Sequence, residues 1–239
     1  MALRTRAEAQ PSESVAVANA TAAVIGAIAF SEFFLLTLYM QQVLGYSAIE
    51  TGVGFVAVTF TIIVFSNVAQ TLVTRVGVRA VLTTGLVLDA VALALFTQLP
   101  VHGHYFWDLF PAFLISGVGL ALSFVPVTIA GLAGVQRADA GIASGLINTS
   151  RQVGGAVGLA AVTTIAASYA ATGSGATGLA RVAAIDGGLT DGFQVAFAVL
   201  TGAAIAGALI SAVMLRPTPE GAEVESLTSP STARLEEAA

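Results

Sequence analysis

Three ionisable residues stand inside apolar stretches of this sequence. Glu32 lies in AIAFSEFFLLTLYMQ, Asp89 in TTGLVLDAVALAL, and Arg151 in GIASGLINTSRQVGGAVGLA. A charge at the centre of a bilayer costs about 2.5–3.5 kcal/mol on insertion scales, and such residues usually face a bundle interior or a wet cavity. Buried carboxylates commonly mark proton pathways. We therefore predict Glu32 and Asp89 as proton-coupling candidates, the alternative being neutral, hydrogen-bonded acids between helices.

Arg151 belongs to a stripe of small and polar residues. At about 100° per residue, one narrow helix face carries most of them. The stripe contains Ser144, Asn148, Arg151, Gly155, Gly158 and Val162, with Gln152 at its flank. Small residues allow another backbone to approach closely in a membrane, so we predict helix-packing roles for Ser144, Gly155 and Gly158. We predict that Asn148, Arg151 and Gln152 line a central or substrate cavity, together with Tyr39, which shares the face of Glu32.

Two roles for Arg151 stay open. In the first, its guanidinium donates hydrogen bonds to carbonyls or to a carboxylate on a neighbouring helix and locks the bundle. In the second, it binds an anion or controls the protonation of Glu32 or Asp89. Both roles require the side chain to face protein or a cavity rather than lipid.

The composition indicates that lipid is the solvent for much of the chain. Of 239 residues, 56% are hydrophobic and only 10% are charged, whereas about a quarter are charged in soluble domains. Cysteine is absent, which excludes disulfides and thiol chemistry. No Ser/His/Asp arrangement, nucleotide loop or HExxH motif occurs. We therefore expect no enzyme activity, no cofactor, no metal site and no nucleic-acid partner.

Six apolar segments are each near or above the length of about 20 residues that spans a bilayer as a helix. They lie at about 15–40, 52–70, 80–99, 106–130, 142–170 and 192–215. We predict an all-α integral membrane protein with one six-helix bundle over residues 15–215. Residues 1–14 form a predicted cytoplasmic N-tail, and the acidic residues 216–239 form a predicted disordered cytoplasmic tail.

The arginines predict the orientation of the bundle, because positive residues concentrate on the cytoplasmic side. Seven fall in segments that would be cytoplasmic, and one, Arg181, falls in an outer loop. The seven are Arg4, Arg6, Arg75, Arg79, Arg137, Arg216 and Arg234. We predict a multi-pass protein of the bacterial plasma membrane with both termini in the cytoplasm.

The same segments resemble a known family. GIASGLINTSRQVGGAVGLA resembles the signature of the second-to-last helix of the fourteen-helix drug/proton antiporters of the major facilitator superfamily. FFLLTLYMQQVLGYSAIETG is similar to the ninth helix and its outer turn, and LVTRVGVRAV resembles a short basic cytoplasmic loop. The resemblance covers roughly residues 17 to 216 and corresponds to the C-terminal bundle of that family.

The resemblance implies an exporter of hydrophobic or amphipathic compounds, driven by protons through alternating access, whose partners are small hydrophobic or cationic substrates, protons and the lipid bilayer. It carries Asn148, Arg151 and Gln152 over as motif positions. Glu32 and Asp89 match no motif, so their predicted coupling role rests on burial alone.

The resemblance also implies that a second bundle is absent, because alternating access needs two halves. The chain is then a truncated fragment, which we favour, or pairs with a separate N-terminal half, or pairs with a second copy of itself. A different class of function is a non-transporting assembly or regulatory partner that docks on another membrane bundle.

Overall fold

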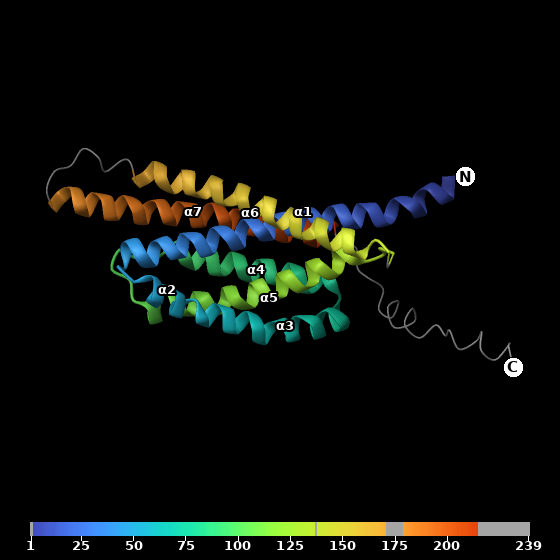
Figure 1. Cartoon of the computed structure of the whole chain (residues 1–239), viewed down its shortest axis with the longest axis horizontal. Coiled ribbons are helices and arrows are strands. Elements are labelled where there is room, and N and C mark those ends of the chain that lie inside the picture. The colour runs from blue at the N-terminus through green and yellow to red at the C-terminus, as the bar shows by residue number, and fades with distance from the viewer. Residues whose placement is uncertain (1, 137, 171–178, 215–239) are drawn as a thin grey trace.

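The structure of the chain is a computed structural model that describes the backbone of residues 2–136, 138–170 and 179–214 (Figure 1). Within these residues every regular element is a helix and no strand occurs, which confirms the predicted all-α class. The tail at 216–239 lies outside the described residues, so its disorder stays a prediction.

The described chain contains seven α-helices and two π-helical turns. In order they are α1 (Ala2–Leu38), the π-helical turn Tyr39–Val43, α2 (Ala48–Gly54), α3 (Val56–Val76), α4 (Val78–Phe96), the π-helical turn Tyr105–Leu109, α5 (Phe110–Leu132), α6 (Ala140–Ala170) and α7 (Leu179–Met214). Each of the six predicted segments falls on one or two of these elements.

The helices extend beyond the predicted segments where polar sequence continues them. The segment at 15–40 lies inside α1 and its π-helical turn, because α1 begins at Ala2 and takes in the predicted N-tail. The last segment, at 192–215, is similarly preceded by helix, since α7 begins at Leu179. The prediction followed apolar residues, whereas Ala, Arg, Glu and Gln also favour helices. Apolar character therefore predicts where the membrane spans lie better than it predicts where the helices begin and end.

Two local signals set the boundaries of α2, α3 and α4. At the start of α2, the Glu50 backbone N–H donates to the Ser47 hydroxyl at 3.3 Å, and the Ser47 N–H donates to the Glu50 carboxylate at 2.8 Å. This reciprocal capping satisfies two free donors of the first turn. Between α3 and α4 stands Gly77 alone, with a φ of 83° that glycine adopts readily. One residue therefore reverses the chain between two membrane helices.

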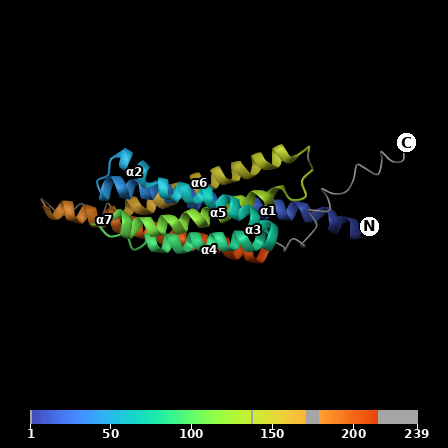
Figure 2. The same ribbon diagram turned by 90° about the horizontal axis from the view of Figure 1, so that it is seen from below.

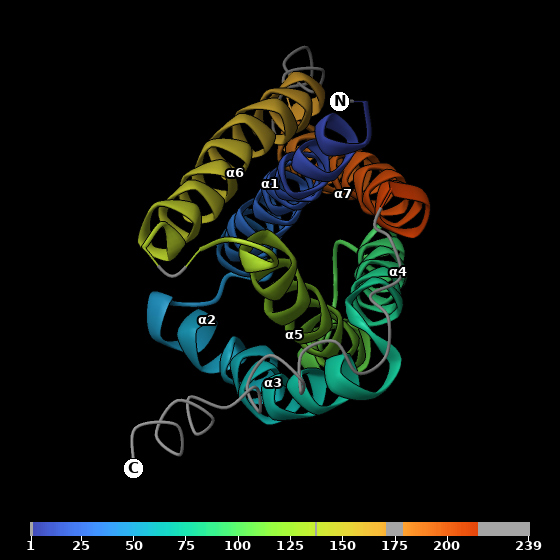
Figure 3. The same ribbon diagram turned by 90° about the vertical axis from the view of Figure 1, so that its right-hand side faces the viewer.

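The helices lie side by side along the long axis of the molecule in two perpendicular views (Figures 1 and 2). Viewed from one end, α1 lies between α6 and α7, and α5 lies between α1 and α3 (Figure 3). α4 packs against both α5 and α7. As a result α6 and α3 flank α1 and α5 on one side of the bundle, and α4 and α7 form the opposite side.

An aromatic cluster connects four helices in the core. The ring centroid of Phe96 on α4 lies 5.8 Å from that of Phe113 on α5 and 5.3 Å from that of Phe197 on α7. Tyr39, after α1, meets Phe193 of α7 edge-on at 6.4 Å. All five side chains are buried. Because aromatic side chains bury large areas with defined geometry, this cluster fixes α1, α4, α5 and α7 relative to one another.

Five helical stretches in the described residues are long and apolar enough to cross a membrane. They are Val15–Val43, Ala48–Val76, Val78–Phe96, Tyr105–Leu132 and Thr190–Met214. α6, which contains the fifth predicted segment, is also long enough to cross a bilayer, with 31 residues and Arg151 as its one charged residue. It packs along α1 and α7, so protein covers part of its surface.

Candidate functional site

Glu32 is buried at the interface of α1 and α5. Its side chain is 1% exposed, and the Ser116 hydroxyl on α5 donates a hydrogen bond of 2.5 Å to its Oε1 atom. The second carboxylate oxygen, Oε2, is buried and has no hydrogen-bond partner among the described residues. The site therefore compensates this carboxylate with one side-chain donor only.

Asp89 has the same arrangement about two helical turns further along α5. Its side chain on α4 is 1% exposed, and the Ser123 hydroxyl donates a hydrogen bond of 3.1 Å to Oδ2. Oδ1 is buried without a hydrogen-bond partner in the described part of the chain and lies against Gly119, where a Cβ atom would overlap it. Glycine at position 119 makes room for this carboxylate against the α5 backbone.

One face of α5 thus serves both carboxylates. Ser116, Gly119 and Ser123 are separated by three and four residues, a spacing that places side chains on one side of a helix. The two serines are seven residues apart, which corresponds to about 10 Å along the helix axis. Glu32 from α1 and Asp89 from α4 therefore reach α5 at two levels, about two helical turns apart. We call these five residues the carboxylate–serine site.

Arg151 lies over an aromatic ring rather than beside a carboxylate. Its guanidinium carbon is 4.9 Å from the ring centroid of Phe124 on α5, within the range of a cation–π interaction. Its Nε atom is buried with no hydrogen-bond partner among the described residues. In that part of the chain Arg151 forms no ion pair with Glu32 or Asp89. The contact with Phe124 connects α6 to the helix that carries both serines.

Glycines bring α6 close to α1. A Cβ atom at Gly158 would overlap Ala27, and one at Gly155 would overlap the ring of Phe30. On the facing helix, a Cβ atom at Gly26 would overlap the main-chain carbonyl of Arg151. These contacts place two of the three predicted packing residues at this interface. The third, Ser144, is exposed, and its hydroxyl donates to the Gly141 carbonyl of its own helix at 3.0 Å.

The other three residues that were predicted to line a cavity lie partly at the surface and partly in the core. Gln152 lines a cavity of about 440 Å³ between α1 and α6, together with Phe30 and Phe34. Asn148 is exposed on α6 but does not line this cavity. Tyr39 is fully buried, and its hydroxyl donates to the Pro100 carbonyl at 2.6 Å. The structure therefore places Tyr39 in the core, where it ties the end of α1 to the loop after α4.

Sequence reasoning did not identify Ser116 and Ser123 as site residues. The available signal was a pair of hydroxyl side chains seven residues apart in SGVGLALS, inside an otherwise apolar span. That spacing puts the two serines on one helix face. It does not say which helices adjoin that face, so their carboxylate partners depend on the tertiary structure.

A family model described as Major Facilitator Superfamily matches residues 6–159 of the chain. The matched region runs from α1 into α6 and contains Glu32, Asp89 and Arg151. It also includes Ser116 and Ser123, so the whole carboxylate–serine site falls within the match.

Several curated proteins are similar to this chain. It is 31% identical over 208 residues to the puromycin resistance protein pur8 of Streptomyces alboniger, an alignment that covers 86% of this chain and 41% of that protein. It is 38% identical over 189 residues to the cephamycin export protein CmcT of Amycolatopsis lactamdurans, covering 77% of this chain and 37% of that protein. The chain spans less than half the length of either relative.

Proposed function

The chain belongs to the major facilitator superfamily, and from that premise we propose that it forms one half of a proton-driven exporter of hydrophobic or amphipathic compounds. The prediction of a transporter rather than an enzyme is confirmed by this family and by the relatives named as export proteins. The proposed activity belongs to an assembly of two bundles, because alternating access requires two halves that move about a site between them.

The observation that carries the proposal is the carboxylate–serine site. Glu32 and Asp89 are each 1% exposed and each accept a hydrogen bond from one serine hydroxyl. Each keeps one oxygen without a partner in the part of the chain that the structure describes. A buried ionised carboxylate with a single donor is poorly compensated, and a proton on the free oxygen removes the charge. Proton uptake and release at these atoms therefore changes the free energy of the α1–α5 and α4–α5 interfaces.

The cavity between α1 and α6 supports the proposed substrate class. Two of its aromatic side chains, Phe30 and Phe34, are 46% and 39% exposed, and Gln152 adds an amide. Aromatic faces bind apolar groups and attract cations. Relatives named for puromycin resistance and cephamycin export support an amphipathic substrate.

We further propose that the bundle lies in the bacterial plasma membrane with both termini in the cytoplasm. The support is that most arginines fall in the segments that would be cytoplasmic with this orientation. Arg75 and Arg79, on either side of the α3–α4 turn, are two of them. The second bundle is supplied by a separate N-terminal half or by another copy of this chain, since the two halves of this superfamily are parallel repeats.

A chimeric transporter tests this function. The chain replaces the region of the cephamycin export relative that aligns with it, and the chimera is expressed in cells that lack their own exporters. We expect efflux of an amphipathic cationic dye such as ethidium, abolished by a proton uncoupler. Glu32→Gln and Asp89→Asn should each lower this efflux, whereas Glu50→Gln, at an exposed helix cap, should leave it unchanged.

The same cells also report on the chain expressed alone. Uncoupler-sensitive efflux from the chain alone would mean that two copies form the transporter. An inserted, stable chimera without efflux would contradict the proposal and favour a non-transporting assembly partner. Full efflux from the double variant Glu32→Gln/Asp89→Asn would contradict proton coupling at the carboxylate–serine site while leaving export intact.

A further inference from the structure

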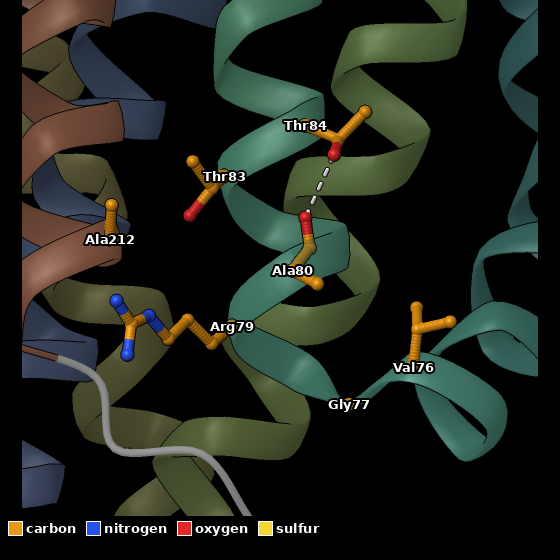
Figure 4. Close-up of a pocket in the computed structure, with 7 residues that line it drawn as sticks. All are labelled: Val76, Gly77, Arg79, Ala80, Thr83, Thr84 and Ala212. Carbon is orange, nitrogen blue, oxygen red and sulfur yellow. Dashed lines mark hydrogen bonds between the residues drawn. The ribbon is translucent and has the colours of Figure 1, made fainter.

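Two adjoining cavities lie along the seam between α4 and α7. The first, of about 460 Å³, is at the end of α4 next to the α3–α4 turn and contains Arg79, Thr83 and Thr84 (Figure 4). The second, of about 420 Å³, continues between the two helices towards Ala94. Thr83 and Ala212 line both cavities, so they form one continuous depression. We call it the α4–α7 groove.

The groove is polar at one end and apolar along the rest. Arg79 is partly exposed at the polar end, and Figure 4 shows its side chain extending across the groove towards Ala212 of α7. Further along, the lining is almost entirely aliphatic. Val91, Ile205 and Leu209 there are 45%, 49% and 61% exposed. Such a group of exposed aliphatic side chains is typical of a surface that faces lipid or another apolar partner.

The depth of the groove matches the geometry of a bilayer leaflet. Arg79 is the second residue of α4, a membrane-spanning stretch, so it lies near the membrane interface. Ala94 is fifteen residues further along α4, about 22 Å deeper at 1.5 Å per residue. One leaflet is about 20–22 Å thick when its polar head-group region is counted together with its hydrocarbon. A charged head group at Arg79 would therefore leave its acyl chain beside the apolar part of the groove.

The guanidinium of Arg79 has no charged or hydrogen-bonding partner among the residues that the structure describes. Within the described residues it forms no ion pair, whereas the nearby threonine hydroxyls are engaged. Thr83 donates to Ser211 of α7 at 3.3 Å, and Thr84 donates to the Ala80 carbonyl at 2.9 Å. Arginine presents a planar fork of donors that matches the oxygens of a phosphate.

We propose that the α4–α7 groove binds an anionic phospholipid, with the phosphate on Arg79 and an acyl chain along Val87, Val91 and Ile205. Basic pockets between membrane helices bind anionic head groups by the same physics. A soluble anion would use Arg79 but not the aliphatic lining, and an acidic peptide would not fill a groove that continues into the hydrocarbon. The groove is a different surface from the cavity between α1 and α6 that is proposed for the substrate, because the two share no lining residue.

Native mass spectrometry of the purified full chain tests the proposal, with phosphatidylglycerol and phosphatidylcholine of identical acyl chains as the probes. We expect the chain to retain phosphatidylglycerol in preference. Arg79→Gln should weaken that preference about fivefold, the effect of one basic residue near a membrane surface. Arg75→Gln is the matched control, because Arg75 is exposed at the end of α3 and does not line the groove.

A second pair of variants tests the apolar part. Ala212→Phe should lower retention of both lipids by narrowing the groove, and Val213→Phe, at an exposed neighbouring position outside it, should not. Equal losses for Arg75→Gln and Arg79→Gln, or no effect of Ala212→Phe, would overturn the proposal. So would displacement of phosphatidylglycerol by inorganic phosphate, or by a peptide of residues 217–239, because either result would assign the groove to a different occupant. Each variant is compared only after its elution and thermal unfolding match those of the unmodified chain.

Discussion

Among the described residues, Ser116 provides the one hydrogen bond that reaches the Glu32 carboxylate from another helix. Removing the hydroxyl leaves a buried acceptor with no donor, which costs about 1–3 kcal/mol and more for a charged group. We expect Ser116→Ala to lower the thermal stability of the protein in detergent. Ser66→Ala is the control, because Ser66 donates to the Ile62 carbonyl of its own helix, an acceptor already used by the helix backbone. Equal, small shifts for the two variants would argue against a stabilising role of Ser116.

Gly119 tests the other half of the carboxylate–serine site. A Cβ atom there would overlap Oδ1 of Asp89 and approach its backbone nitrogen, so Gly119→Ala must displace either the carboxylate or α4. We expect a loss of stability despite the gain of about 1 kcal/mol in helix propensity. Gly145→Ala on α6 has open space around it and should be neutral or stabilising. Thermal unfolding of the two variants under identical conditions makes the comparison, and a stabilised Gly119→Ala protein would contradict the described packing.

At the scale of helices, the sequence predicted the existence of the elements better than their ends or contacts. Runs of apolar residues coincide with the five described stretches that are long and apolar enough to cross a membrane, because the bilayer demands a minimum apolar length. They did not locate the start of α1 at Ala2 or of α7 at Leu179, because polar residues can continue a helix. The helical spacing of Gly155 and Gly158 indicated the face on which α6 packs against α1. The position of Tyr39 could not be predicted in this way, because its partners Pro100 and Phe193 come from distant segments that place it in the core.

The α1–α6 interface leads to a prediction at this scale. The Ser150 hydroxyl donates to Oδ1 of Asn19 at 2.9 Å, so cysteines at these two positions should react together with a short thiol cross-linker. The native chain contains no cysteine that would interfere. Gly154→Val should suppress the cross-link, because a side chain at position 154 would meet the backbone of Ala23. Gly145→Val serves as the control on an open face of α6, and unchanged cross-linking in Gly154→Val would show that the helices pack differently.

For the whole molecule, the alternating direction of the helices predicts which segments share a side of the membrane. The α3–α4 turn and the α4–α5 loop lie at opposite ends of the bundle (Figure 1). With the proposed orientation, Thr74→Cys should react with a membrane-impermeant thiol reagent only after the cells are opened, and His102→Cys should react in intact cells. Both positions are exposed. Labelling of Thr74→Cys in intact cells would reverse the orientation, and labelling of both positions from one side would contradict the bundle.

The single residue between α3 and α4 has a mechanical consequence. A linker of several residues would let two helices slide past each other, but Gly77 alone provides no slack for such a movement. The two helices can still change their relative angle at Gly77, since glycine adopts positive and negative φ angles readily. The movements of α3 and α4 are therefore coupled: a displacement of one helix along the membrane normal carries the other helix with it. Because Asp89 lies on α4, a movement of α3 displaces this carboxylate directly through the α3–α4 connection.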